Sequence, residues 1–508
     1  MSQKKSLQFM LFAEISIYVG VWATISILKF VSLDANIYDL GISVERAWQI
    51  THGSVYSFNS FLSILSTSGI VFFFAPLAEF FPFFTFLFIQ TFFIAISSFV
   101  IFRIAIKSGL SYTRAFVISS VYLIYFPVAG INWFDFHYQA FFIPIFLLGY
   151  LFYLSNKHLL SILILFISGL VRFPFMLFPL LFSLCVLFGL FNQTDGEAFQ
   201  KFRKYYIALF VISAIFLAAG FHYSNHIGTN ILHNSNSIAM PVSLHIIKIF
   251  QVLIMIMAPL LFLPMVSKRW ALFFIPFFAL LSLSNNPYFY YPSLFHRQYA
   301  SLFVAFIFLG AIDVLSYGNH PSKRKNLSKL QLRFVKGIRR YGPIMIVYIL
   351  VTSLIMACFF EPYGPFNYGT EDRFTPISDF FNPSINRFAF VNYVVELIPQ
   401  NQTEFTVIQN NIPQFLPREL GPGGFILDLP LTQFVNISAS NFTRNNFSFV
   451  FNNQILFTKV NYILADSLND QYSAGIISME WFVNEAIMSG YYHIVYSYSG
   501  IELIERNS

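Results

Sequence analysis

The chain has 508 residues, of which 56% are hydrophobic and only 10% are charged. Soluble domains carry about 25% charged residues, so this composition excludes an ordinary soluble protein. The net charge of +7 does not indicate nucleic-acid binding, because lysine and arginine cluster in short loops between apolar segments. Cys185 and Cys358 lie far apart in apolar segments, which argues against a disulfide framework or a cysteine metal site.

Apolar segments long enough to cross a bilayer recur from the N-terminus to about residue 360. The first follows the basic sequence MSQKK and lacks a small-residue cleavage site, so we expect a retained span rather than a signal peptide. We predict about eleven spans in all. Their approximate limits are 7–31, 83–106, 113–129, 138–154, 159–172, 174–191, 206–222, 246–265, 270–284, 299–316 and 343–360.

A further apolar segment, LSILSTSGIVFFFAPLAEFFP, ends at Pro82 directly before the second span. Because it has no loop of its own at that end, an interfacial or re-entrant helix over 62–81 is favoured over a full span. The sequence leaves the choice between these forms open.

The distribution of basic residues predicts the orientation. With the N-terminus inside, the cytoplasmic loops hold about 19 of the 30 lysines and arginines. Asp313, near the cytoplasmic end of its span, is expected to reach the interface by snorkelling. We therefore predict a multi-pass protein of the plasma membrane. An odd number of spans then places the segment after residue 360 on the extracytoplasmic side.

The tail over 361–508 has a different composition from the membrane part over 1–360. Charged and turn residues return, and short β-rich segments (FTVIQ, GFILDL, NYILAD, HIVYSYSGIELIER) alternate with the helical patterns SINRFAFVNYVVELIP and MEWFVNEAIM. We therefore predict an extracytoplasmic α/β domain. An outer location agrees with four glycosylation sequons, at Asn401, Asn436, Asn441 and Asn446.

Acidic candidates lie on two predicted outer segments. The first outer loop, SLDANIYDLGISVERAWQITHG, carries Asp34, Asp39 and Glu45. Asp39 precedes a predicted helix over about 41–51, so it either caps that helix or serves catalysis or metal binding. Asp135 and His137, in INWFDFHYQ between the third and fourth spans, form either an interfacial ion pair or part of a site.

Basic candidates lie on two other outer segments. Arg172 stands in VRFPF between the fifth and sixth spans, and His296, Arg297 and Tyr299 stand in SNNPYFYYPSLFHRQYAS between the ninth and tenth. A charge at membrane depth costs about 2.5–3.5 kcal/mol on insertion scales, so such groups normally face a cavity or a partner. Phosphate binding and a structural pairing with the acids are both compatible with these residues.

Nucleotide-binding and hydrolase motifs are missing from the sequence. It contains no P-loop, no G-x-G-x-x-G after a strand, no H-E-x-x-H and no G-x-S-x-G. This argues against an ATP-driven pump.

Three stretches resemble the predicted membrane proteins that carry domain of unknown function 2079: YDLGISVERAW with the following HG, APLAEFFPFFTFLFIQ, and FPVAGINWFDFHYQA. The tail pattern LIPQNQTEFTVIQNN with NYILAD is also similar. The chain differs from the usual family pattern at Glu45, Ser66 and Arg172. The family itself is similar to integral-membrane glycosyltransferases of the C-type fold, which place an acid in the first outer loop and an interfacial helix after it.

This resemblance implies transfer of a sugar from a polyprenyl-phosphate-linked donor to a cell-surface acceptor at the outer face. Asp39 would be the general base or a ligand of Mg²⁺ or Mn²⁺, and Asp135 and His137 would orient the acceptor or complete a metal site. Arg172, His296 and Arg297 would stabilise the phosphate leaving group. The expected partners are membrane lipids, the donor, and the acceptor or envelope proteins, with no nucleic acid. A transporter or flippase, or a structural anchor of an envelope assembly, remains the alternative.

Overall fold

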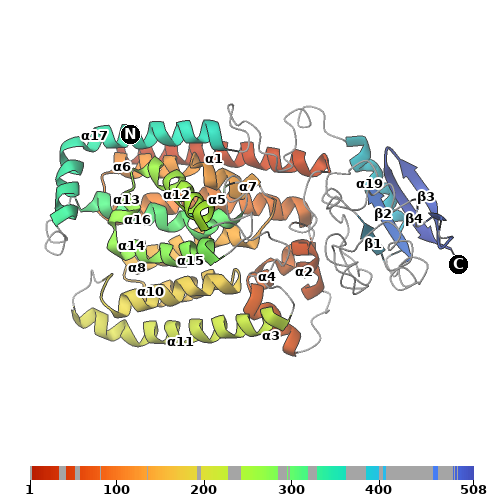
Figure 1. Ribbon diagram of the computed structural model, residues 1–508, viewed down its shortest axis with the longest axis horizontal. Helices are drawn as coiled ribbons and strands as arrows, with labels where there is room; N and C mark the ends of the chain where they lie inside the picture. Colours follow the sequence, from red (N-terminus) through yellow and green to blue (C-terminus); the bar gives the residue numbers. More distant parts are fainter. Residues whose placement is uncertain are drawn as a thin grey trace. The chain divides into compact units, whose positions relative to one another are not determined.

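The computed structural model describes most of the chain (Figure 1). The described residues are 3–33, 40, 42–51, 58–79, 82–133, 135–191, 196–226, 242–283, 295, 298–317, 329–361, 385–399, 404–407, 461–466, 484, 487–488 and 490–507. These residues are mainly helical, with a small sheet near the C-terminus.

The chain divides into two compact units. The first comprises Met1–Ala23, Val55–Phe73 and Phe88–Asp372, and the second comprises Thr24–Ser54, Phe74–Leu87 and Arg373–Ser508. The first unit contains most of the apolar helices, and the second contains the sheet. The boundary that we predict at residue 360, between a membrane domain and an extracytoplasmic domain, stays a prediction.

Among the described residues, four helices are long and apolar enough to cross a membrane. They are α1 (Gln3–Val31), α5 (Pro82–Lys107), α11 (Gly196–His226) and α17 (Lys329–Phe360). α6 (Tyr112–Leu123) and α7 (Phe126–Trp133) add a fifth span if this pair, bent by 42°, is counted as one. These elements match five of the predicted segments.

The remaining predicted spans coincide with shorter elements. A helix of 13 residues, such as α8 or α16, is about 20 Å long, against a hydrocarbon core of about 30 Å. The number of spans and the orientation therefore stay predictions. The shorter elements are η3 (Tyr138–Phe141), α8 (Phe142–Leu154), α9 (His158–Gly169), η4 (Phe173–Met176), α10 (Leu177–Leu187), α12 (Val242–Met257), η5 (Ala258–Leu260), α13 (Leu263–Val266), α14 (Lys268–Ala271), η6 (Leu272–Phe274), α15 (Ile275–Leu283), η8 (Gln298–Leu302) and α16 (Val304–Ser316).

The segment predicted to lie in the interface is divided into short helices: α3 (Phe58–Ser68), α4 (Val71–Phe74) and η2 (Ala75–Glu79). None of the three is long enough to span a bilayer by itself. Before them, α2 (Ile42–Thr51) confirms the helix predicted over about 41–51.

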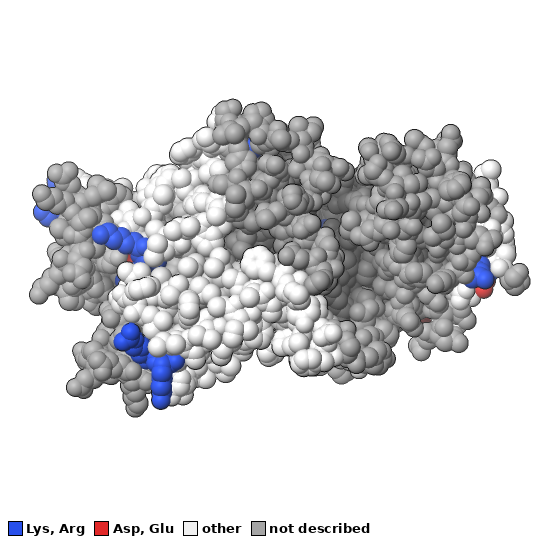
Figure 2. All heavy atoms as spheres, turned by 60° about the horizontal axis from the view of Figure 1, so that its bottom comes forward, with Lys and Arg blue, Asp and Glu red and all other residues white. Residues whose placement is uncertain are grey.

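Basic side chains are distributed unevenly on the helical unit. On the face shown in Figure 2, the described lysines and arginines of this unit gather at one end of a surface that is otherwise almost uncharged. Cytoplasmic loops carry an excess of Lys and Arg, and the placement of this end in the cytoplasm stays a prediction.

The core of the helical unit is aromatic and centres on α16, all of whose residues are buried. Aromatic pairs contribute about 0.5–1.5 kcal/mol beyond the burial of their area, which gives the abundant phenylalanine of this chain a structural use. Five rings surround Phe306, with centroids 4.8 to 6.2 Å away: Phe142, Phe146, Phe178, Trp270 and Phe273.

α16 approaches α13 closely at Gly310, where a Cβ atom would lie 2.8 Å from Cα of Pro264. Gly310→Leu is therefore expected to lower stability by at least about 1–3 kcal/mol, because backbone on the facing element cannot yield to the new side chain. Thermal unfolding of the detergent-solubilised protein measures the effect. The control is Gly20→Leu, since a Cβ at Gly20 would meet no atom within 4 Å. Equal unfolding temperatures for the two variants would contradict the close packing.

The second unit contains a four-stranded sheet in the order β1-β2-β4-β3. The strands are β1 (Glu404–Val407), β2 (Tyr462–Asp466), β3 (Tyr492–Tyr498) and β4 (Ile501–Arg506). β1 and β2 are parallel, and the other pairs are antiparallel. Ser499 and Gly500, with φ of 48° and 81°, form the two-residue turn between β3 and β4. Positive φ at both positions matches the right-handed twist of the two strands.

α19 (Ile385–Leu397) packs on this sheet through Val391, Val394 and Val395, which bury Leu464 and Leu503 among other residues. The first of the two helical patterns and three of the four β-rich segments of the tail are thus confirmed. The segment GFILDL, most of the helical pattern MEWFVNEAIM and the four sequon asparagines lie outside the described residues. The location of this unit outside the cell stays a prediction.

Candidate functional site

The loop that carries Asp135 and His137 is held by one side chain of α5. The Gln90 amide nitrogen donates to the Asp135 carbonyl (2.6 Å), and its oxygen accepts from the His137 backbone N–H (2.6 Å). The amide therefore pairs with the loop backbone as a neighbouring strand would. Because Gln90 is 1% exposed, water competes little for these bonds.

The backbone at Asp135 adopts the left-handed conformation, with φ of 64°. This conformation costs a non-glycine residue about 1–2 kcal/mol, and such strain gathers at functional sites. Asp135 and His137 are nearly buried, at 3% and 5% exposure. The structure thus fixes the backbone of a buried loop that carries a carboxylate and an imidazole inside the helical unit.

Two more polar side chains lie beside this loop. Thr91 donates to the Asn132 side-chain oxygen (2.9 Å), and both residues are buried. Within the described part of the chain, the Asn132 amide nitrogen has no hydrogen-bond partner. A buried amide without an acceptor is costly, so this nitrogen is suited to bind an oxygen atom of a ligand.

Tyr299 belongs to η8, which packs against α7 and η3, the two elements that flank this loop. The preceding Phe295 is buried and contacts Phe126 of α7, with ring centroids 5.0 Å apart. The short segment between them contains His296 and Arg297, which lie outside the described residues. The structure thus brings two of the predicted outer segments together.

Arg172 lies in a break between α9 and η4 and has an extended backbone. The carbonyl oxygens of this break are paired with the end of α3: Ile70 N–H donates to Leu170 (2.9 Å), and the Ser68 hydroxyl donates to Val171 (3.4 Å). The break therefore has a structural partner in the predicted interfacial segment. The Arg172 side chain is partly exposed.

The other predicted acids are not placed by the structure. Asp34 and Asp39 lie outside the described residues, and Glu45 is described only as part of α2. Among the described residues, no three His, Cys, Asp or Glu side chains form a group that could hold a metal ion. The role of Asp39 and the divalent cation stay predictions.

Sequence reasoning missed Gln90, Thr91 and Asn132. Gln90 and Thr91 are adjacent polar residues within a mainly apolar helix, and that interruption was a readable signal. Their partners lie more than 40 residues away, so spacing alone could not identify them.

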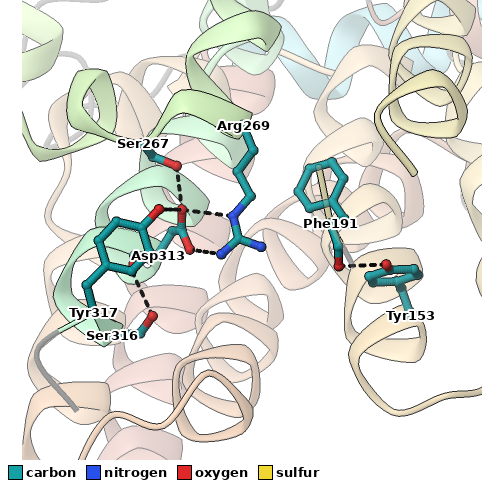
Figure 3. Close-up of polar contacts among 7 residues, drawn as sticks. All are labelled: Tyr153, Phe191, Ser267, Arg269, Asp313, Ser316 and Tyr317. Carbon is teal, nitrogen blue, oxygen red and sulfur yellow. Dashed lines mark hydrogen bonds and ion pairs between the residues drawn. The ribbon is translucent and has the colours of Figure 1, made fainter. Parts of the chain in front are cut away.

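A second buried polar cluster corrects the prediction for Asp313 (Figure 3). Instead of snorkelling, Asp313 accepts two bonds from the Arg269 guanidinium, one of them from Nε at 2.9 Å, and is 5% exposed. Ser267 and Tyr317 also donate to it, at 2.6 and 2.8 Å. The carboxylate stays buried because every bond it accepts stabilises its charge.

The sequence over residues 29–406 matches the model of the family described as "Predicted membrane protein (DUF2079)". This match covers most of the chain, which therefore belongs to that family of membrane proteins. No curated protein matches the sequence significantly. The crystal structure of an oligosaccharyltransferase from Archaeoglobus fulgidus aligns with 95% of this chain and 73% of its own, at 12% identity and a TM-score of 0.31. That score is too low to support an argument.

Proposed function

We propose that this protein is a membrane glycosyltransferase that takes a sugar from a polyprenyl-phosphate-linked donor and transfers it to an acceptor hydroxyl at the outer membrane face. The observation that supports it best is the loop held by Gln90. That loop carries Asp135, in the left-handed conformation, and His137, and it follows α7, whose Asn132 amide nitrogen has no hydrogen-bond partner among the described residues. A fixed constellation of this kind suits catalysis better than packing.

In the proposed reaction, a carboxylate removes the acceptor hydroxyl proton as the oxygen attacks the anomeric carbon. The bond from that carbon to the phosphate oxygen breaks, and the polyprenyl phosphate leaves with the electron pair. Asp39 is the proposed base, with metal binding as the alternative role of that carboxylate. Asp135, His137 and Asn132 would orient the acceptor, while Arg172, His296 and Arg297 would stabilise the phosphate charge.

A lipid-linked donor fits the remaining features of the chain. Nucleotide-activated sugars are not available outside the cell, and the sequence has no nucleotide-binding motif. A polyprenyl chain needs an apolar surface beside the site, which membrane helices provide.

A transporter or flippase is the second candidate, favoured by the broken helices. α6 and α7 meet at 42°, and α9 is separated from η4 by the break at Arg172. Discontinuous helices often line the substrate path of transporters. For a transporter, deletion of the whole protein should change the pools of lipid-linked sugars, whereas replacement of a single carboxylate should not.

Asp39→Asn is expected to lower sugar transfer by at least about a hundredfold, the range for loss of a general base. Asp135→Asn is expected to lower it by about a hundredfold, because the acceptor loses its position. Mass spectrometry of surface glycans and lipid-linked sugars would show loss of one sugar and accumulation of its donor, as in a deletion strain. Glu396→Gln, on the exposed surface of α19, is the control. A changed pool in the deletion strain with unchanged pools in both point variants would favour transport instead.

A further inference from the structure

α1 carries a single acidic residue, Glu14, in the middle of an otherwise apolar helix that is long enough to cross the membrane. At a rise of about 1.5 Å per residue, Glu14 lies about 16 Å along the helix from its first residue, Gln3. This depth is well inside a hydrocarbon layer of about 30 Å. Carboxyl groups at such depth are rare and usually functional.

Glu14 is held by α6. The Ser120 hydroxyl donates to the Glu14 carboxyl oxygen (2.7 Å) and also reaches the Phe116 carbonyl oxygen (3.1 Å). Phe12 of α1 stacks on Phe99 of α5 at 5.1 Å, so a second helix lies beside this stretch. Within the described part of the chain, no basic side chain pairs with Glu14. The site therefore has no fixed counter-charge to keep the carboxyl ionised.

One turn further along α1, Tyr18 presents a second polar group on the same face. Tyr18 is 7% exposed, and its hydroxyl has no hydrogen-bond partner among the described residues. The neighbouring Tyr122 hydroxyl is already used, since it donates to the Ile94 carbonyl oxygen (3.1 Å). A buried hydroxyl without a partner, one turn from a carboxyl, is a site for an exchangeable proton.

Glu361 lies at the end of α17, just beyond the membrane-spanning part, where the preceding Phe360 contacts Phe126 at the start of α7, with ring centroids 5.7 Å apart. Burial raises the pKa of Glu361 to about 7, so this carboxyl changes charge near neutral pH. A group of this kind can pass protons between water and the interior of a helical bundle.

We propose that Glu14 is a proton-binding carboxyl inside the membrane, at the interface of α1 and α6, and that it exchanges its proton through Tyr18 with the end of α17 that carries Glu361. In each step the Tyr18 hydroxyl accepts a proton on one side and releases its own on the other, so its charge does not change. This site is separate from the proposed transfer site and does not rest on it.

Labelling with dicyclohexylcarbodiimide tests the proposal in native membranes. The reagent adds the O–H of a protonated carboxyl across its C=N bond and rearranges to a stable adduct, which peptide mass spectrometry locates. The peptide that contains Glu14 should be labelled at pH 6 and at least tenfold less at pH 9. Glu14→Gln should lose that adduct, and Glu361 is read separately because it lies on another peptide.

The exchange path is tested by a rapid change from pH 6 to pH 9 before labelling. After the change, Glu14 in Tyr18→Phe should stay as reactive as at pH 6 for at least ten times longer than Glu14 in the wild type. In Ser120→Ala the reactivity of Glu14 should fall as fast as in the wild type. Labelling that is equal at pH 6 and pH 9 would make Glu14 a permanently protonated structural group. Protection by sodium chloride but not choline chloride at fixed pH would make the ligand a metal cation. An unchanged response of Tyr18→Phe would overturn the path. Each of these three results contradicts the proposal.

Discussion

Replacing Asp313 by asparagine is expected to lower the free energy of unfolding by about 3–5 kcal/mol, because it leaves the buried Arg269 guanidinium charged without its counter-charge. Arg269 and Asp313 are 12% and 5% exposed, so water cannot solvate the remaining charge. Arg269→Met should be similarly destabilising, since the carboxylate then lacks its cation. Thermal unfolding in detergent, read from tryptophan fluorescence, gives the order of the variants.

The double variant Arg269→Met/Asp313→Leu is the sharper comparison, because it removes both charges and should be more stable than either single variant. His493→Gln is the matched control. It breaks an exposed pair with Glu505 at 4.0 Å, in which the partners are 54% and 37% exposed, and such pairs contribute about 0–1 kcal/mol. If Asp313→Asn unfolded like His493→Gln, the buried pair would have no structural importance.

Gln90→Met is expected to abolish the proposed sugar transfer as fully as Asp135→Asn does, although Gln90 bears no charge. Methionine fills a similar volume but removes the bonds that Gln90 makes to the Asp135 carbonyl and the His137 N–H, at about 1–3 kcal/mol for each. The loop would then move to satisfy them, and the two side chains would lose their positions. The lipid-linked sugar assay and thermal unfolding measure both effects.

Ser98→Ala is the control for Gln90→Met. Ser98 lies on the same helix and donates a buried bond of the same kind, to the Ser119 carbonyl oxygen at 2.8 Å, away from the loop. It should lose some stability and keep its activity. Loss of transfer in Ser98→Ala to the same degree would show that general weakening of α5, rather than the loop geometry, controls the reaction.

The positions of the helices were largely predictable, because apolar composition alone shows which segments a bilayer can accept. Their interruptions were not. Leu261 and Phe262, between η5 and α13, both adopt the left-handed conformation. Neither is a glycine, so the sequence does not indicate it. Only the surrounding packing can impose such a conformation, and packing is not visible in one sequence.

The site was predictable in part for a similar reason. Asp135 and His137 stand out because ionisable residues are rare in this chain, but Gln90 resembles any polar residue in a helix until its partners are known. Asp313 shows the opposite error. Its position at the end of a span suggested contact with water, whereas its actual partner, Arg269, lies 44 residues earlier and was counted only as a loop charge. Glu14 stands in the sequence as an acid in an apolar segment, but it was not among the predicted candidates.

The two bonds of Gln90 also determine how motion reaches the loop. Both bonds come from one rigid amide on α5, so the backbone between Asp135 and His137 must follow any rotation of that helix about its axis. Turning α5 by one residue, about 100°, would carry the amide away and release both bonds together. The loop is thus coupled to a membrane helix through one side chain, so a displacement of α5 at Gln90 would also displace the backbone of Asp135 and His137.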